Sequence, residues 1–196
     1  MIEKLINTVL KGDGDSDRHL MTLFSIALST RGKNFLELGV RNGDSTLPLL
    51  LASKLCNAEL HSVDINQTNF EVPEELKDSW KFFQEDSIEF LKNTETHYDL
   101  IYIDDWHSYE HVKKELEILD SKISPSTIIL LHDLMYGDTC PFYHVDLTIK
   151  DGQWGNGGPY RAVAELNPQF WEFSTIPHNN GLTILRKKYS NKYRRK

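Results

Sequence analysis

The chain has 196 residues, which fits one domain with a substantial core, and 39% of its residues are hydrophobic. Its formal net charge of −7 argues against a general affinity for nucleic acid, because neutralising phosphates requires a surplus of Lys and Arg on the binding face. The only cysteines are Cys56 and Cys140, and their spacing indicates neither a disulfide framework nor a thiolate metal site.

Two features of the chain bear on its surroundings. No apolar run approaches the roughly 20 residues needed to cross a bilayer, and the N-terminus lacks a basic segment followed by an apolar core. We therefore expect a cytoplasmic protein with no membrane partner. Seven of the 22 basic residues lie in the last eleven positions, 186–196, and we interpret the basic tail, 187–196, as a solvated terminus rather than a phosphate or membrane contact.

The first half of the chain predicts helices and then alternating strands and helices. The hydrophobic pattern predicts helices over 2–11 and 17–29, before the first strand. The elements predicted after them are strands at 34–40, 59–64, 81–84 and 98–104, and helices at 45–54, 73–79, 87–93 and 109–119. Alternation at this spacing indicates a parallel sheet with right-handed crossovers.

The second half adds a strand, a long loop and a hairpin. Residues 126–132 form a continuous apolar run typical of a buried strand. Residues 135–159 are rich in Gly, Pro, Asp and aromatic residues and lack periodicity, so we interpret them as a substrate loop. Pro159 opens a helix, and 170–175 and 181–186 flank a short turn. The prediction is one α/β domain with a Rossmann-like, mostly parallel sheet, a C-terminal antiparallel hairpin and helices on both faces.

Acidic residues follow the strands of this predicted sheet. They are Glu37, Asp64, Asp86 and Asp104. Ligands of open parallel sheets bind beyond the carboxyl ends of the strands, so we expect these residues at the ligand site. The turn after the first strand carries Gly39 and Gly43, but it lacks Gly-x-Gly-x-x-Gly and a Gly-Lys-Ser/Thr sequence, which disfavours dinucleotide and phosphate binding. Acidic residues beside Gly39 suit a cationic ligand instead.

The motifs together resemble a known family. Glu-x-Gly-x-x-x-Gly-x-Ser-Thr from Glu37, Ser-Val-Asp ending at Asp64, Tyr-Asp-Leu-Ile-Tyr-Ile-Asp-Asp-x-His-Ser-Tyr from Tyr98 and a later His-Asp are similar to class I S-adenosylmethionine (SAM) methyltransferases. Within them the chain most resembles the small-molecule O-methyltransferases of methyltransferase family 24, which include the macrocin-type sugar methyltransferases. The resemblance covers residues 33–135. Arg41 replaces the middle glycine of the commoner pattern, which leaves the course of the turn open.

The resemblance implies SAM as the cofactor. It places Glu37 and Gly39 at the methionine end, Asp64 at the ribose hydroxyls, and Asp86 with Ser87 at the adenine. The full set of expected cofactor-binding residues is Glu37, Gly39, Val40, Arg41, Gly43, Ser45, Asp64, Ile65, Asp86, Ser87 and Asp104. Two of them have a structural alternative: Glu37 could end a strand in a tight turn, and Asp86 could cap the helix that begins at Ser87.

Methyl transfer to a hydroxyl requires a group that takes the proton. His107 follows the fourth strand and imidazole titrates near neutral pH, so we predict His107 as the general base, with Asp133 as a second catalytic residue. Asp104, Asp105 and Asp133 are hard oxygen ligands that suit Mg²⁺ or another divalent cation. For His107 the alternative is a backbone-bonded residue at a helix start, and for Asp133 a polar cap after its strand.

Three functions compete at this point. The first is a metal-assisted O-methyltransferase for a small hydroxyl compound, such as a sugar. The second is a metal-independent SAM methyltransferase with another acceptor, and the third is a SAM-binding module without catalysis. Aromatic residues of the loop, Tyr136, Phe142, Tyr143 and Trp154, could stack on an acceptor or pack the loop. We interpret Arg161 as a solvated surface residue, and a homo-oligomer stays open.

Overall fold

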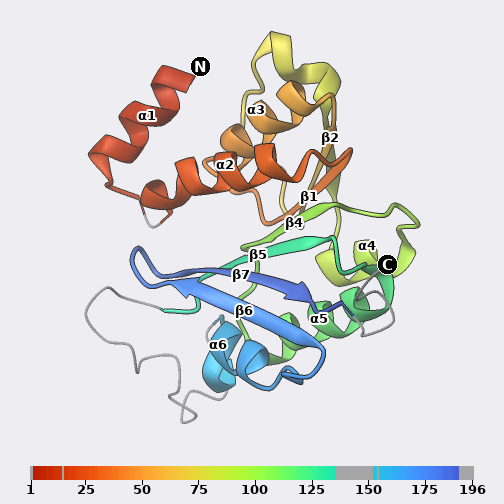
Figure 1. The fold of residues 1–196 in the computed structure, drawn as a ribbon. Helices are drawn as coiled ribbons and strands as arrows, with labels where there is room; N and C mark the ends of the chain where they lie inside the picture. The colour runs from red at the N-terminus through yellow and green to blue at the C-terminus, as the bar shows by residue number, and fades with distance from the viewer. Residues whose placement is uncertain (1, 15, 136–151, 154, 190–196) are drawn as a thin grey trace. The chain divides into compact units, whose positions relative to one another are not determined.

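The computed structural model describes residues 2–14, 16–135, 152, 153 and 155–189 (Figure 1). Its contacts divide the chain into two compact units, Met1–Asp105 and Trp106–Lys196, and each is described by itself. Most of the predicted substrate loop, with Tyr136, Phe142, Tyr143 and Trp154, lies outside the described residues. So do residues 190–196 of the basic tail.

The first unit opens with helices, as predicted. Helix α1 spans Ile2–Lys11. The second predicted helix begins as a 3-10 turn, η1 (Asp17–His19), before α2 (Leu20–Thr30). The carboxylate of Asp17 accepts a hydrogen bond from the backbone N–H of Gly14 (2.8 Å), which tightens the chain at this entry.

Four parallel strands form the sheet of the first unit. They are β1 (Asn34–Leu38), β2 (Glu59–Asp64), β3 (Trp80–Gln84) and β4 (Leu100–Ile103). Their order is β3-β2-β1-β4, and the register pairs Glu37 of β1 with Ser62 of β2 and with Tyr102 of β4. Every residue of β4 is buried, as expected for a strand covered on both faces. The parallel sheet predicted from the sequence is confirmed.

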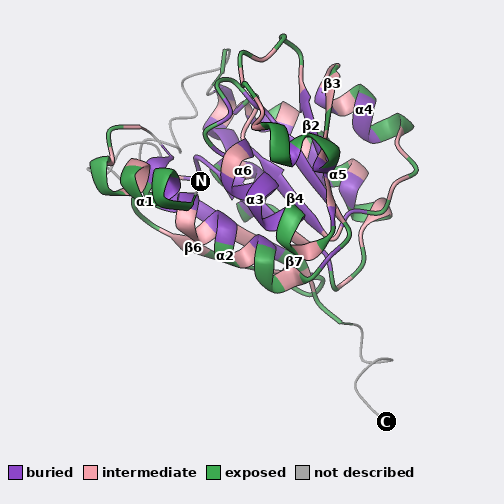
Figure 2. Cartoon of the chain, turned by 90° about the horizontal axis from the view of Figure 1, so that it is seen from above, coloured by how far each residue is buried: buried purple, intermediate pink, exposed green. Residues whose placement is uncertain are grey.

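Helices α3 (Thr46–Cys56) and α4 (Ser87–Asn93) accompany this sheet. Helix α3 contacts α2, β1 and β2, and most of its residues are buried (Figure 2). The segment predicted as a helix at 73–79 is a 3-10 helix, η2 (Glu74–Ser79), rather than an α-helix. Such short 3-10 turns are common connectors, and this one leads directly into β3.

The second unit contains helices α5 (Tyr109–Lys122) and α6 (Gly158–Ala164), the 3-10 turn η4 (Gly155–Gly157), and strands β5 (Ile128–His132), β6 (Trp171–Ile176) and β7 (Leu182–Lys187). Strand β7 pairs antiparallel with both β5 and β6. The connection from β6 to β7 holds Asn179, Asn180 and Gly181 at positive φ, which Asn and Gly tolerate best. This confirms the predicted C-terminal hairpin.

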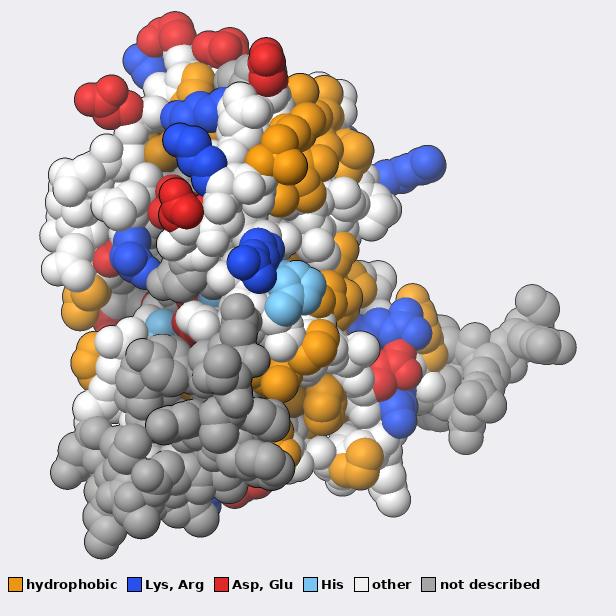
Figure 3. Space-filling model, turned by 90° about the vertical axis from the view of Figure 1, so that its left-hand side faces the viewer, with side chains coloured by type: hydrophobic (Ala, Val, Ile, Leu, Met, Phe, Trp, Pro, Cys, Tyr) orange, Lys and Arg blue, Asp and Glu red, His pale blue; other side chains and the backbone are white. Residues whose placement is uncertain are grey.

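The surface carries charges of both signs. On the face shown in Figure 3, both acidic and basic side chains are exposed, and several acidic side chains lie together at the top of the view. Among the described residues, no helix combines the length and the apolar character that crossing a lipid bilayer requires.

Candidate active site

The turn after β1 passes closely over the end of β4. Gly39 has φ +89°, and its N–H donates to the carbonyl oxygen of Val63 on β2 (2.9 Å). A Cβ atom at Gly39 would lie 2.2 Å from the carbonyl oxygen of Asp104. Only glycine fits a position that requires both a left-handed backbone and this close approach. Gly39 therefore lets the turn pack directly against the backbone at the end of β4.

Glu37 supports this turn from a fully buried position. Its carboxylate accepts hydrogen bonds from Ser45 (2.7 Å), Thr46 (2.8 Å) and Ser62 (2.6 Å). Burial raises the pKa of Glu37 to about 7, and the three hydroxyl bonds oppose that rise. The carboxylate thus ties β1 to β2 and to the start of α3. This position supports the turn, whereas contact with the methionine end of SAM stays a prediction.

Asp64, at the end of β2, holds the same turn from the other side. Its Oδ2 atom accepts from the backbone N–H groups of Val40 (2.9 Å) and Arg41 (3.1 Å), and its Oδ1 atom accepts from Asn66 (2.8 Å). A carboxylate has about four acceptor positions, so these three bonds leave room for about one hydroxyl. The expectation that Asp64 accepts both ribose hydroxyls therefore needs one backbone bond to be released.

Arg41, which replaces the glycine of the commoner pattern, adopts φ +47°. This left-handed conformation is unfavourable for a residue with a Cβ atom. Two bonds hold it: its N–H donates to Asp64, and its carbonyl oxygen accepts from the hydroxyl of Thr68 (2.9 Å). Arg41 thus has the left-handed backbone conformation that favours glycine, although it carries a basic side chain.

A pocket opens at this edge of the sheet within the first unit. It is shallow: the centre of a water-sized sphere can reach only about 20 Å³, and the empty space is about 310 Å³ when the part open to solvent is included. Its lining residues are Ser16, Gly39, Val40, Arg41, Asp44, Ser45 and Asp104. Five of these were predicted from the sequence. Ser16 and Asp44 were not, although Asp44 lies inside the quoted motif; Ser16 comes from the segment before α2, which no motif connects to the turn.

The remaining predicted cofactor residues lie outside this lining. Asp86 caps α4, because its Oδ1 atom accepts a hydrogen bond from the backbone N–H of Glu89 (3.0 Å). The capping role that the sequence analysis gave as an alternative to adenine contact is therefore present. Ser87 is buried beside it, and Ile65 is 65% exposed just after Asp64. At Gly43 a Cβ atom would lie 2.2 Å from the ring of Phe70, so packing requires a glycine there.

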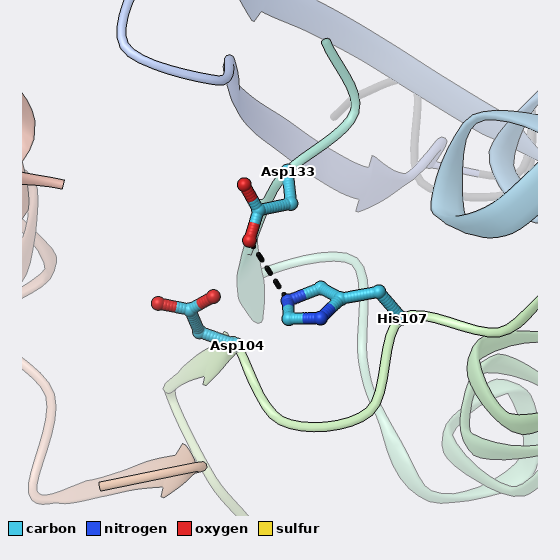
Figure 4. Close-up of side chains that lie close together, drawn as sticks. All are labelled: Asp104, His107 and Asp133. Atoms are coloured by element: carbon cyan, nitrogen blue, oxygen red, sulfur yellow. Dashed lines mark ion pairs between the residues drawn. The ribbon is translucent and has the colours of Figure 1, made fainter. Parts of the chain in front are cut away.

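The second unit holds the predicted base. The Nε2 atom of His107 lies 2.8 Å from Oδ2 of Asp133, and both side chains are at most 9% exposed (Figure 4). Asp133 follows β5 with φ +64°, and its N–H donates to the carbonyl oxygen of Gly181 (3.0 Å). Asp is one of the residues that tolerate this left-handed conformation. The structure therefore pairs the two predicted catalytic residues.

The carboxylate of Asp133 has a second imidazole neighbour, His132, with Nδ1 3.3 Å from Oδ1. Burial alone would raise the pKa of Asp133, but hydrogen bonds from His107 and then His132 outweigh burial and hold that pKa well below its usual range. Asp133 is therefore an ionised acceptor between two histidines.

The predicted metal ligands are divided between the units. Asp104 and Asp105 end the first unit, and Asp133 belongs to the second. The hydroxyl of Tyr102 donates to Oδ2 of Asp104 (2.8 Å). The metal site and its third ligand stay predictions.

Comparison with known proteins shows which family the chain belongs to. A family model described as "Methyltransferase domain" (methyltransferase family 24) matches residues 36–134. No curated protein matches the chain. The fold matches that of Rossmann-like methyltransferases, with parallel strands and a C-terminal antiparallel hairpin. The predicted fold class is therefore confirmed. The chain belongs to this methyltransferase-domain family.

Solved structures support the fold over most of the chain. The O-methyltransferase TomG from Streptomyces achromogenes, in complex with SAM, has a TM-score of 0.65 and 13% identity, and the match covers 95% of this chain and 89% of TomG. An O-methyltransferase from Bacillus cereus, in complex with SAH, has a TM-score of 0.61 and 16% identity, covering 95% and 90% of the two chains. SAH-bound PaMTH1 from Podospora anserina has a TM-score of 0.63 and 19% identity, covering 87% and 78%.

Proposed function

We propose that this protein is a SAM-dependent methyltransferase that transfers a methyl group to a hydroxyl of a small molecule, such as a sugar. The observation that carries the proposal is the acidic pocket beside Gly39, in a chain of the methyltransferase-domain family. Gly39 lets the turn pack directly against the backbone after β4, which keeps Val40 and Arg41 beside Asp104 at the edge of the pocket. SAM carries a positive charge on its sulfonium and another on its amino group, which suits the carboxylates of Asp44 and Asp104.

The residues of the pocket would bind the cofactor, and His107 would act on the acceptor. Asp44 and Asp104 attract the cationic groups, and Asp64 accepts a ribose hydroxyl. SAM supplies a methyl group that is activated by the sulfonium, whose sulfur retains the electron pair of the broken carbon–sulfur bond. His107 takes the proton of the acceptor hydroxyl as its oxygen bonds to the methyl carbon, and Asp133 stabilises the resulting imidazolium.

We also propose that a divalent metal ion assists the methyl transfer. Asp104, Asp105 and Asp133 offer the oxygen atoms that Mg²⁺ prefers, and a bound cation would stabilise an alkoxide. A metal-independent methyltransferase is the second candidate. The observation in its favour is that both carboxylate oxygens of Asp133 already face an imidazole nitrogen, Oδ2 that of His107 and Oδ1 that of His132, so the carboxylate has partners without a cation.

Calorimetry with SAM tests the proposal first, because binding is its foundation. Radiolabelled methyl transfer is then measured with two hydroxyl probes, catechol and a methyl glycoside, each with Mg²⁺ and with EDTA. Transfer that EDTA abolishes supports metal assistance, and transfer that survives EDTA supports the second candidate. Absence of SAM binding by folded protein contradicts both candidates.

A further inference from the structure

The pocket beside Gly39 is lined by side chains of both charges, all within the first unit. Asp44 and Asp104 contribute carboxylates, and Arg41, the basic residue of the lining, contributes a guanidinium. Arg41 and Asp44 are both exposed, so their charged groups can meet a ligand that enters from solvent. A ligand that complements this lining carries positive groups and also a negative one.

The backbone of Arg41 is fixed from both sides. Its N–H donates to Oδ2 of Asp64 (3.1 Å), and its carbonyl oxygen accepts from the hydroxyl of Thr68 (2.9 Å). These bonds hold the residue at φ +47°, and the position of a Cβ atom follows from the backbone around it. The side chain of Arg41 therefore starts from a defined point of the pocket edge, next to the carboxylate that we expect at the ribose.

The methionine end of SAM has a third charged group besides its sulfonium and its ammonium. The proposed function gives the two positive groups to Asp44 and Asp104. The α-carboxylate of SAM is negative, so these two acidic residues repel it and another residue must supply its counter-charge. A guanidinium can pair with a carboxylate through two parallel N–H···O bonds, which Lys cannot do. Arg41 has the charge and the donors that this carboxylate requires.

We propose that the side chain of Arg41 binds the α-carboxylate of SAM and thereby makes the site selective for the intact amino-acid end of the cofactor. This inference rests on the proposed function for the presence of SAM. Two carboxylates of the pocket then meet the two positive groups of SAM, and the guanidinium meets the negative one. A glycine at position 41 would suit φ +47° better but would offer no side chain to the carboxylate. Arginine at this position thus combines a less favourable backbone with a charged contact to the ligand.

Calorimetry with two ligands tests this contact. SAM and decarboxylated SAM carry the same sulfonium and amino groups, and only SAM carries the carboxylate. Wild-type protein should bind SAM about tenfold more tightly, an effect between that of an exposed ion pair and that of a hydrogen bond to a charged group away from water. In Arg41→Gln, SAM should lose about this factor. Decarboxylated SAM should bind at least as tightly as before, because the variant removes a charge that repels it.

Two further variants separate the charged contact from the backbone of the turn. Arg41→Gly removes the side chain and accepts a positive φ readily, so this variant should fold and should also lose affinity for SAM alone. Arg31→Gln is the matched control, because Arg31 is another exposed arginine of the first unit at a positive φ, +51°. This control should leave the affinities for both ligands unchanged.

Two results overturn the proposal. One is a preference for SAM over decarboxylated SAM that is the same in the wild type and in both Arg41 variants. The other is an equal loss of both ligands in Arg41→Gln, which would show that Arg41 acts through the shape of the turn. If the wild-type protein binds neither ligand, the proposed function fails as well. If it binds SAM and only the effect of Arg41 is missing, this inference fails alone.

Discussion

Glu37 is a carboxylate that folding removes completely from water and supplies with three hydroxyl donors. Burial raises its pKa from 4.5 to about 7, so the folded state retains a proton that the unfolded chain has released between these values. Stability contributed by this residue is therefore greatest below pH 4.5 and is lost as the pH rises toward 7. At the residue scale, the carboxylate of Glu37, which supports the turn, also makes the free energy of unfolding depend on pH.

We predict that Glu37→Gln removes this pH dependence. The wild-type free energy of unfolding should fall between pH 4.5 and pH 7 by an amount on the order of 3 kcal/mol relative to the variant. Urea unfolding across this range measures the difference. Glu3→Gln, on the exposed surface of α1, should keep the wild-type slope. Parallel curves for the wild type and Glu37→Gln would show that Glu37 does not titrate in this range.

Asp64→Ala should weaken SAM binding and loosen the turn together. Each lost hydrogen bond contributes about 0.5 to 1.5 kcal/mol, and the variant loses the bonds to Val40 and Arg41 besides the expected ribose bond. Calorimetry gives the loss of affinity, and thermal unfolding gives the loss of stability. Asp78→Ala, an exposed change in η2, is the control. Unchanged SAM affinity removes Asp64 from the binding site.

At the scale of elements, α5 and α6 are joined by a polar cluster. Glu165 accepts hydrogen bonds from the Tyr109 hydroxyl (2.5 Å) and from Arg161 (2.9 Å), and the guanidinium of Arg161 lies 4.0 Å from the centre of the Tyr109 ring. Bonds from Tyr109 and then Arg161 lower the pKa of Glu165 to about 2. Arg161, interpreted from the sequence as a solvated surface residue, is thus part of a helix contact.

Helix α4 offers a test that separates a cap from a ligand contact. Asp86→Ala removes the cap and should lower the free energy of unfolding by about 1 kcal/mol, whereas Asp86→Asn should retain most of the stability because Asn caps equally well. Chemical denaturation measures both variants. If Asp86 also contacts the adenine, Asp86→Asn keeps its stability but loses SAM affinity. If Asp86→Asn binds SAM with the wild-type affinity, then Asp86 only caps α4 and does not contact the adenine.

For the molecule as a whole, a ligand that binds only the folded state stabilises it by mass action. SAM at 100 times its dissociation constant should raise the free energy of unfolding by about 2.7 kcal/mol. Asp44 of the pocket is not a predicted metal ligand and attracts the cationic groups of SAM with or without a metal, so EDTA should leave most of this stabilisation in place while it removes any metal-dependent turnover. Thermal unfolding with SAM, with EDTA and with both measures the effect. Loss of the SAM effect in EDTA would show that the metal takes part in cofactor binding.

Local signals predicted most of the elements. Apolar periodicity and caps gave α1, β2 and α4 with the bounds that the structure has, and the Asn-Asn-Gly turn predicted the β6–β7 hairpin. The errors lie where local signals are weak. Residues 73–79 have helical spacing, but Pro73 precedes a stretch too short for a stable α-helix, and a 3-10 turn formed.

The sequence alone determined the alternation of elements, the turn at Gly39 and the set of acidic residues that follow the strands, because periodicity, turn propensity and order along the chain are local properties. Tertiary structure alone decided that Ser62 bonds to Glu37, that Ser16 lines the pocket and that Gln153 faces His107. These contacts join residues far apart in the chain. Strand register and chain path bring them together, and no spacing rule in the sequence encodes either.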